Sequence, residues 1–431
     1  MNFMSAKRRR RQFIVLILAL TAGISISILR PGPVFMDAQA YSEIAQEVAA
    51  GRGFASTTLN RIQAVNPLYP LFLAGIYKVF GINYNIVRIV QAIIFAITCL
   101  IIFRIAELIF DERIGFWSSL LVASHPVMFS TVSHLLTECF YTFLIALGIL
   151  LLTLSFRKSN WWLFFLTGVV FGLGLLCRST GLFFPLFILL GLIFIIKSKL
   201  KIVGYFLALC LGVIVTISPW MIRLYLVSGA IQPLTNMGGR VFWFGTYVPA
   251  KGDSDSDLAQ KAFASVLEKI KTEGINREQE PVKWDRRLYL EGLKNIQDHP
   301  FGYIALFPRN ILRLWVGTHS TCFTIGDIKF SAFFKNPELL KKRPFVFIWK
   351  LCILALTFLT FILAVIGIIY SFYNWTRTMP LLLIFFYTTI FHIIVLAISR
   401  YSIPAIPYEI IFAVLGIQGL AKVIIMKKER K

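Results

Sequence analysis

Several ionisable side chains stand at the ends of apolar stretches, where a charge is costly and usually has a function. If the N-terminus is cytoplasmic, they all face the outer side of a membrane; they are Asp37, Arg61, His134, Glu138, Arg178, Arg223 and Arg400. A guanidinium group suits phosphate because its planar fork donates paired hydrogen bonds. A carboxylate suits proton transfer when it lies near a reacting hydroxyl. Together these residue types favour chemistry on a lipid-linked phosphate at a membrane surface.

The two acids each admit a structural and a chemical interpretation. Asp37 begins a predicted helix, so it either caps free backbone N–H groups or acts as a general base. Glu138 is not needed as a cap, because Thr137 or Ser133 would serve. His134 precedes Glu138 by four residues, on the same predicted helical face, but two ligands make a poor metal site. A hydrogen bond between His134 and Glu138 is therefore favoured, while a divalent metal on this pair stays open.

Two arginines close apolar runs, Arg178 in LLCRSTG and Arg400 in ISRYSIPAIP. Either alone would be explained by snorkelling, in which a long basic side chain reaches the lipid headgroups. Both stand on the face that holds the two acids, and Arg61 adds a third guanidinium group there. The combination favours binding of a phosphate over snorkelling alone.

The composition indicates a membrane protein. Hydrophobic residues make up 57% of the chain, with 40 Phe, and the mean hydropathy is +0.74. A soluble domain of that composition would not cover its own surface with polar groups. The net charge of +23 comes mostly from short Lys/Arg clusters between apolar runs, which is the pattern that orients membrane proteins. This placement excludes a nucleic-acid-binding function as the reason for the charge.

About ten apolar runs of roughly 20 residues are long enough to cross a bilayer. They lie near 13–29, 86–109, 115–132, 138–155, 161–177, 180–196, 202–218, 346–370, 379–398 and 404–425. The first is predicted to be an uncleaved span rather than a signal peptide, because it has the length of a span and no small-residue cleavage site clearly follows. The predicted fold class is an all-α polytopic membrane protein.

The basic clusters set the predicted orientation. With a cytoplasmic N-terminus, most of the short-loop Lys and Arg residues fall on the inner side. The inner connections are then Asp111–Arg113, Arg157–Lys158, Lys197–Lys201, Arg377 and Lys427–Lys431. An even number of spans places both termini in the cytoplasm, in a cell (inner) membrane.

Two outer segments, 30–85 and 219–345, are too long to be simple turns. In the first, DAQAYSEIAQEVAAG and NPLYPLFLAGIYKVFG are predicted to be helices lying at the outer interface. The second has a polar middle followed by HPFGYIALFPRNILRLW, and forms a larger outer loop or small domain. The chain thus divides into a transmembrane module (1–218) whose first outer loop carries the candidate site, the outer segment (219–345) and C-terminal transmembrane helices (346–431).

Short motifs recur along the chain in a particular order: Asp-x-x-x-Tyr, Pro-x-Tyr-Pro-Leu, Thr-Glu at the start of a span, an arginine turn, and Arg-Tyr-x-x-Pro. They are carried by Asp37, Tyr41, Pro67, Tyr69, Pro70, Leu71, Thr137, Glu138, Arg178, Arg400, Tyr401 and Pro404. Their order and placement resemble the GT-C superfamily of membrane glycosyltransferases. Within it the chain resembles family-39 and family-83 type proteins, relatives of protein O-mannosyltransferases and the lipid A aminoarabinose transferase. The similarity is strongest over 30–220 and near 400.

The resemblance implies transfer of a sugar from a polyprenyl-phosphate donor to an acceptor hydroxyl on the outer face. It implies Asp37 as the base and Glu138 as a second acid beside it. One base and attack from the opposite face imply inversion at the sugar, as in inverting glycosidases. The other implied contacts are, for the donor phosphate and lipid, Arg61, Arg178, Arg400 and Tyr401, and, for the substrate, Tyr41, Tyr69 and His134.

One departure from the family pattern concerns metal. Some relatives have a charged residue just before the Pro of Pro-x-Tyr-Pro-Leu, where this chain has Val65 and Asn66. A metal ligand from that position is absent, so no cofactor is expected to be required and dependence on a divalent metal stays open.

Two other functions fit the sequence less well than sugar transfer does. A transporter or flippase of a lipid-linked glycan would carry charged or broken segments near mid-bilayer, whereas these charges lie at one mouth. A non-catalytic assembly subunit would not need both acids and the arginines. The expected partners are the bilayer, the polyprenyl-phosphate sugar donor and a glycan, lipid or protein acceptor.

Overall fold

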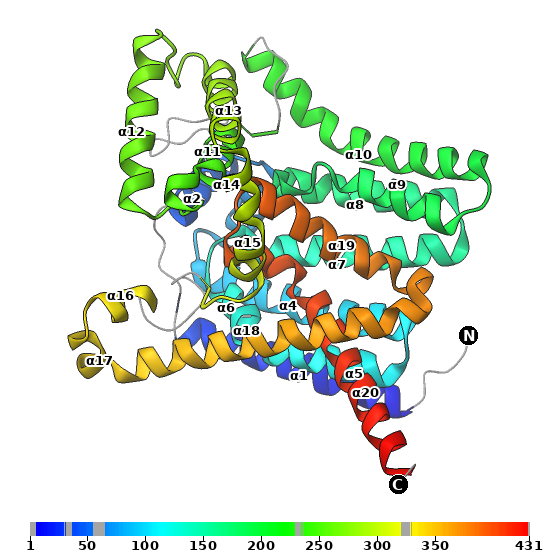
Figure 1. Ribbon diagram of the computed structural model, residues 1–431. Helices are drawn as coiled ribbons and strands as arrows, with labels where there is room; N and C mark the ends of the chain where they lie inside the picture. The colour runs from blue at the N-terminus through cyan, green and yellow to red at the C-terminus, as the bar shows by residue number, and fades with distance from the viewer. Residues whose placement is uncertain are drawn as a thin grey trace.

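The protein is helical throughout the residues that the computed structural model describes. These are 6–29, 31, 37–54, 65–228, 234–235, 237–319, 328 and 330–429, and they contain no strand. The long helices pack side by side in one bundle, and shorter helices gather at one end of it (Figure 1). The predicted all-α class is confirmed.

Six stretches within the described ranges are long and apolar enough to cross a membrane. They are Ala6–Leu29, Tyr84–Ile109, Thr137–Lys158, Lys199–Val227, Pro344–Val395 and Ser399–Met426. The first four stretches correspond to the helices α1 (Ala6–Leu29), α4 (Tyr84–Ile109), α7 (Thr137–Lys158) and α10 (Lys199–Ser228). The fifth contains two helices, α18 (Pro344–Ser371) and α19 (Trp375–Val395), and the sixth covers most of α20 (Ile406–Glu429). The shorter apolar helices α8 (Trp161–Cys177) and α9 (Phe184–Ile195) pack among them. The chain is a multi-pass membrane protein.

The predicted span 115–132 is wrong as a single helix. Its residues form α5 (Glu112–Ser124), α6 (Pro126–Ser130) and the 3-10 turn η1 (Thr131–Ser133). Pro126 lacks the N–H that would continue α5, and a residue before proline avoids the helical conformation. His125 accordingly has an extended backbone, with ψ of 121°. The predicted spans 180–196 and 404–425 likewise begin in short 3-10 segments, η2 (Ser179–Gly181) and η6 (Ser399–Ala405).

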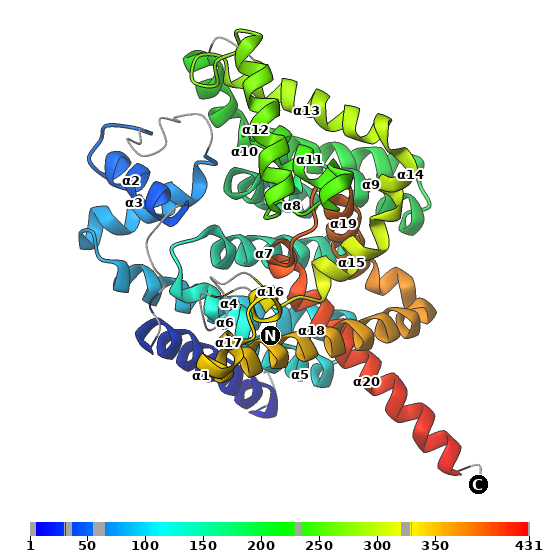
Figure 2. The same cartoon turned by 60° about the vertical axis from the view of Figure 1, so that its left-hand side comes forward.

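The start of α1 and the end of α20 lie at the same end of the bundle (Figure 1). Ion pairs fix the start of α1 there: Arg8 Nη2 lies 2.7 Å from Glu107 Oε2 near the end of α4, and Arg11 Nη1 lies 2.7 Å from Glu112 Oε1 at the start of α5. The first outer segment lies at the opposite end, as α2 (Asp37–Ala49) and α3 (Leu68–Phe80) (Figure 2). The two helices predicted in that segment are therefore confirmed as helices.

Close approach of backbones tightens the bundle between α18 and α20. A Cβ atom added at Gly367 would lie 1.8 Å from the carbonyl oxygen of Phe412, and one at Gly416 would lie 2.2 Å from that of Leu363. Small residues at helix crossings are typical of membrane bundles, where packing rather than hydrophobic burial holds helices together.

The segment predicted as the second outer one forms a helical unit, and its first three helices share an apolar core. Its helices are α11 (Gly238–Thr246), α12 (Asp257–Thr272), α13 (Pro281–Asp298), α14 (Pro300–Ala305), α15 (Phe307–Trp315), α16 (Phe330–Lys335) and α17 (Glu338–Lys342). Trp243, Phe263 and Leu288 are buried together in that core. The unit docks on the bundle through α15, where Trp315 Nε1 donates to Thr389 Oγ1 of α19 at 3.1 Å.

We expect the stability of this outer unit to depend on the protonation of Asp285. The Gly239 N–H donates to its Oδ1 at 2.8 Å, and burial raises its pKa from the ordinary 3.8 to about 6. The folded unit therefore holds this proton to higher pH than the unfolded chain. The resulting stability is fully present below about pH 4 and is lost as pH rises through about 6, a change on the order of 3 kcal/mol.

Thermal unfolding of the purified protein between pH 4 and 7 tests this expectation. Asp285→Asn keeps an acceptor for the Gly239 N–H but removes the titration, so its unfolding temperature should vary less with pH. Asp298→Asn, at the exposed end of the same helix, serves as the control. An equal pH dependence in wild type and Asp285→Asn would contradict the assignment.

Candidate functional site

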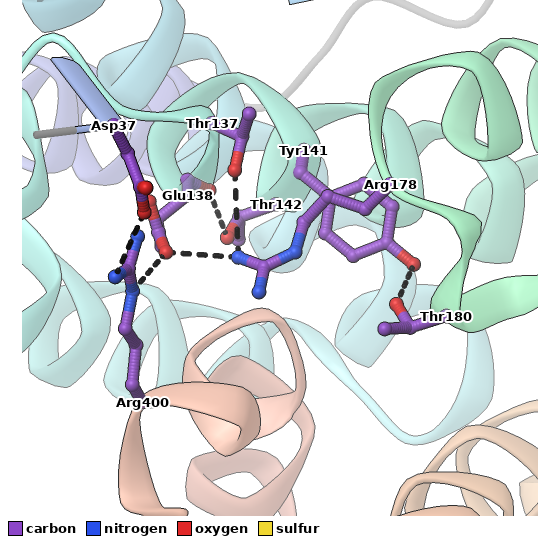
Figure 3. A network of polar contacts seen from close by, with 8 residues as sticks. All are labelled: Asp37, Thr137, Glu138, Tyr141, Thr142, Arg178, Thr180 and Arg400. Carbon is purple, nitrogen blue, oxygen red and sulfur yellow. Dashed lines mark hydrogen bonds and ion pairs between the residues drawn. The ribbon is translucent and has the colours of Figure 1, made fainter. Parts of the chain in front are cut away.

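Four of the predicted site residues meet in one network of polar contacts (Figure 3). Asp37 is the first residue of α2, and Glu138 is the second residue of α7. Arg178 follows the last residue of α8, and Arg400 lies in η6. Each stands at or beside the beginning or end of a helix.

Glu138 is the centre of the group, and its side chain is 0% exposed. Its Oε1 accepts a hydrogen bond from Arg178 Nη1 at 2.8 Å and another from Arg400 Nε at 2.5 Å. A carboxylate buried in this way is costly unless charged partners surround it. Glu138 therefore fixes the positions of both guanidinium groups.

Asp37 occupies a different environment. Its side chain is 64% exposed, and its Oδ2 lies 3.7 Å from Arg400 Nη1. Arg400 thus lies between the two acids, bonded to the buried one and close to the exposed one. Asp37 is the acid that an incoming molecule can reach.

Two aromatic rings hold Arg178 in addition to Glu138. Its guanidinium carbon lies 5.8 Å from the centre of the Tyr141 ring and 5.6 Å from that of Tyr401, which are cation–π contacts. The Tyr141 hydroxyl pairs with Thr180 Oγ1 at 3.3 Å. Burial alone would lower the pKa of Arg178, but the Glu138 carboxylate more than offsets this and raises that pKa above its ordinary value. Arg178 is therefore a fixed positive charge.

Three side chains of this group were not among the predicted site residues. Tyr141 stands three residues after Glu138, so helical spacing was a signal that could have found it. Thr180 stands two residues after Arg178. The ring of His392, from α19, stacks on that of Tyr401 with centres 5.0 Å apart, and no local pattern relates these two residues.

Two predicted substrate contacts, Tyr41 and Tyr69, pack on each other. Their rings meet edge to face, with centres 5.4 Å apart. Burial, and then the Asp37 carboxylate, raise the pKa of the Tyr41 hydroxyl, so the phenol stays protonated and able to donate. Tyr69 is 0% exposed, and its hydroxyl donates to Gln91 Oε1 at 2.9 Å. Tyr69 is thus the buried ring against which Tyr41 packs.

The expected hydrogen bond between His134 and Glu138 does not form. Helix α7 begins only at Thr137, so His134 lies before the helix in extended backbone and not on its face. The Nδ1 of His134 instead contacts Ser133 Oγ at 2.9 Å and the Ser130 carbonyl at 3.1 Å. The prediction applied helical spacing to residues 134 and 138, but His134 is not part of the helix, and this is the reason for the error.

Two predicted arginines lie elsewhere. Arg61 falls outside the described residues. Arg223, from the outer part of α10, lies over the rings of Phe54 and Trp220, 5.1 and 4.8 Å from their centres.

Dependence on a divalent metal stays a prediction that the described residues of the site do not test. The described part of the chain contains no group of three His, Cys, Asp or Glu side chains that could hold one. Two guanidinium groups already lie within 2.8 Å of Glu138 Oε1, so a cation there would meet two positive charges. The pairing of His134 with Glu138 that would have supplied two ligands is also missing.

Removing the charge of Glu138 should destabilise the fold. Glu138→Gln leaves Arg178 and Arg400 buried without their shared counter-charge, and breaking a buried ion pair in this way costs roughly 3–5 kcal/mol. We expect a lower unfolding temperature in detergent. Glu338→Gln, which breaks an exposed pair with Lys342, should leave it nearly unchanged. Equal unfolding temperatures for the two variants would contradict a central role for Glu138.

Comparison with known protein families gives a match over part of the chain. Residues 64–222, less than half of the chain, match the family model of dolichyl-phosphate-mannose-protein mannosyltransferases. The matched stretch contains Tyr69, His134, Glu138 and Arg178. A sequence comparison with curated proteins finds no match.

Two solved structures are similar at low sequence identity. The archaeal oligosaccharyltransferase AglB from Archaeoglobus fulgidus, in complex with an inhibitory peptide and a dolichol-phosphate, has 13% identity and a TM-score of 0.49. The similarity covers 99% of this chain and 52% of AglB, so this chain spans about half the length of that protein. ArnT from Cupriavidus metallidurans, bound to undecaprenyl phosphate, has 13% identity and a TM-score of 0.42, over 94% of this chain and 76% of ArnT. The family match confirms the predicted resemblance to GT-C membrane glycosyltransferases.

Proposed function

We propose that this protein is an inverting GT-C type glycosyltransferase. It moves a sugar from a polyprenyl-phosphate donor to an acceptor hydroxyl at the membrane face opposite its termini. The observation that carries this proposal is the placement of Arg400 between an exposed acid, Asp37, and a buried one, Glu138. That arrangement sets a reachable base beside fixed positive charge.

Asp37 is the proposed base. In the reaction, the acceptor oxygen forms a bond to the anomeric carbon while the bond from that carbon to the phosphate oxygen breaks. The acceptor proton passes to the Asp37 carboxylate, and the electron pair of the broken bond leaves with the phosphate. Attack from the face opposite the phosphate inverts the configuration at the sugar.

The arginines are the proposed phosphate contacts. Each guanidinium group has five N–H donors, more than its contacts with Glu138 use. Because the leaving group gains negative charge as the bond breaks, cations fixed beforehand by Glu138 would stabilise the transition state more than the ground state. Tyr401 packs against Arg178 and would orient it toward the donor.

The proposed role of Glu138 differs from that of a second acid acting on the substrate. Its side chain is 0% exposed and is paired with two arginines, which stabilise its ionised form. A substrate proton has little access to it. Glu138 therefore positions Arg178 and Arg400, and Asp37 carries the proton transfer.

The proposed orientation follows from charge. The basic ends of α1 and α20 lie at one end of the bundle and the site at the other. The positive-inside rule therefore supports a site at the outer face of the inner membrane. The outer unit built from α11–α17 stands beside the site end of the bundle (Figure 2). It is the proposed surface for the acceptor, whether a glycan, a lipid or a protein hydroxyl.

Asp37→Asn should abolish most of the transfer without weakening donor binding. Loss of a general base typically costs 100-fold or more in rate, roughly, and the arginines that hold the donor remain. The measurement is transfer of radiolabelled sugar from a polyprenyl-phosphate donor to membrane acceptors, alongside donor affinity. Glu47→Gln, an exposed acid on the same helix, is the control. Wild-type transfer by a folded Asp37→Asn protein would refute this role, and donor flipping without transfer would support a transporter instead.

Arg178→Lys should weaken donor binding about tenfold. A lysine keeps the charge but lacks the planar fork that binds phosphate and stacks between two rings. Donor titration against the purified variant gives the affinity. Arg52→Lys, at an exposed arginine within the first outer segment, gives the reference. A donor affinity equal to that of wild type would remove Arg178 from the phosphate site.

A further inference from the structure

A cavity of about 370 Å³ lies between the site-facing ends of α1 and α4, apart from the residues that would handle the sugar. It is lined by Ile24, Ser27, Ile28, Pro31, Asn85, Arg88 and Ile89. Cavities that bind small molecules fall in the range of roughly 300–1,000 Å³, mostly apolar with a few polar groups. This cavity has that size and that lining.

The two helices close the cavity at its inner end. A Cβ atom added at Gly23 would lie 3.2 Å from the Cβ of Ala92, so α1 and α4 touch there. One turn further out the helices separate, and Figure 2 shows them side by side along the edge of the bundle. The exposed fractions of Ile28 and Ile89, 74% and 49%, show that the wall is open to the surrounding lipid.

The polar groups of the cavity gather around one buried charge. Arg88 is 6% exposed, its Nε donates to the Ser133 carbonyl at 3.0 Å, and its Nη1 donates to Asn85 Oδ1 at 2.9 Å. Both of these acceptors are neutral, and they orient the guanidinium group. The cavity therefore offers a fixed positive charge at the end of the spans, with apolar walls on the lipid side.

We infer that this cavity binds an anionic glycerophospholipid of the leaflet on the site side. Its phosphate pairs with Arg88 and Asn85, and one acyl chain lies along Ile24, Ile28 and Ile89. The level fits, because α1 ends at Leu29 and α4 begins at Tyr84, where headgroups meet the hydrocarbon region. The charge fits, because a guanidinium group pairs with a phosphate diester and would gain nothing from a neutral tail.

A lipid bound there would contact the segment that leads to Asp37, and through Arg88 it would be linked to the segment that leads to Glu138. Pro31 stands six residues before Asp37, and the Ser133 carbonyl that Arg88 holds belongs to a residue five positions before Glu138. Gln91, one turn after Arg88, donates to the carbonyls of Val132 and His134 at 2.8 and 2.9 Å. The phospholipid would thus help to stabilise both segments, whatever reaction the site performs.

The test is retention of lipid by the full-length protein in nanodiscs made from phosphatidylcholine with or without phosphatidylglycerol. After transfer to detergent, native mass spectrometry counts the retained molecules. Wild type should retain phosphatidylglycerol at least fivefold over phosphatidylcholine. Ile28→Trp, which fills the cavity from its rim, should retain about one tenth of the phosphatidylglycerol that wild type retains. Arg88→Gln should retain phosphatidylglycerol and phosphatidylcholine about equally. Ile214→Trp, on a lipid-facing position of α10, should behave as wild type.

Three outcomes would overturn the inference. The first is equal retention of phosphatidylglycerol by wild type and Ile28→Trp. The second is equal retention of the two phospholipids by wild type. The third is displacement of phosphatidylglycerol by one equivalent of polyprenyl phosphate, which would assign the cavity to that lipid instead. Because Arg88→Gln also removes the contact with Ser133, Ile28→Trp carries the decision if that variant does not fold.

Discussion

The burial of one carboxylate between two guanidinium groups is the interaction on which the site depends. Glu138 is 0% exposed at the start of α7, where an isolated charge would be strongly disfavoured. Arg178 and Arg400 meet its Oε1 at 2.8 and 2.5 Å. Three segments that are far apart in the sequence are therefore held at one point, and the arginines are positioned before any substrate arrives.

The same interaction separates the tasks of the two acids. Glu138 has both arginines as partners and no exposed surface, so its carboxylate holds them in place. Asp37 lies 3.7 Å from Arg400 and has a side chain that is 64% exposed. Arg400 touches both acids and so couples the buried, positioning carboxylate to the reachable one.

Breaks in the helices build this end of the molecule. Non-helical backbone is tolerated at membrane depth only where protein covers it. Here α5 ends before Pro126, α8 ends at Cys177 and α19 ends at Val395, and the chain that follows each break packs into the same region. The segment 130–134 is further held by Arg88 and Gln91 of α4, so the support of Glu138 reaches across to the cavity beside α1. The proposed catalytic groups, their supports and a lipid-facing cavity thus share one set of backbone contacts.

The sequence by itself determined the membrane class, most of the helices, and the four residues that meet at the site. Hydropathy and helical spacing are local properties, and charges beside apolar runs are few because each is costly, so Asp37, Glu138, Arg178 and Arg400 stood out. Only the tertiary structure decided how they pair. The expected partner of Glu138 was His134, which is near in sequence, but His134 lies in extended backbone before α7 and not on the helix.

The contacts that replaced this pair join residues 40 and 262 positions apart. Such contacts leave no periodic trace in the chain. The stacking of His392 on Tyr401 and of Tyr401 on Arg178 is hidden for the same reason, because α19, η6 and α8 meet only when the bundle closes. Local physics selects which residues are costly enough to need a purpose, and the packing of distant helices determines which of them neutralise one another.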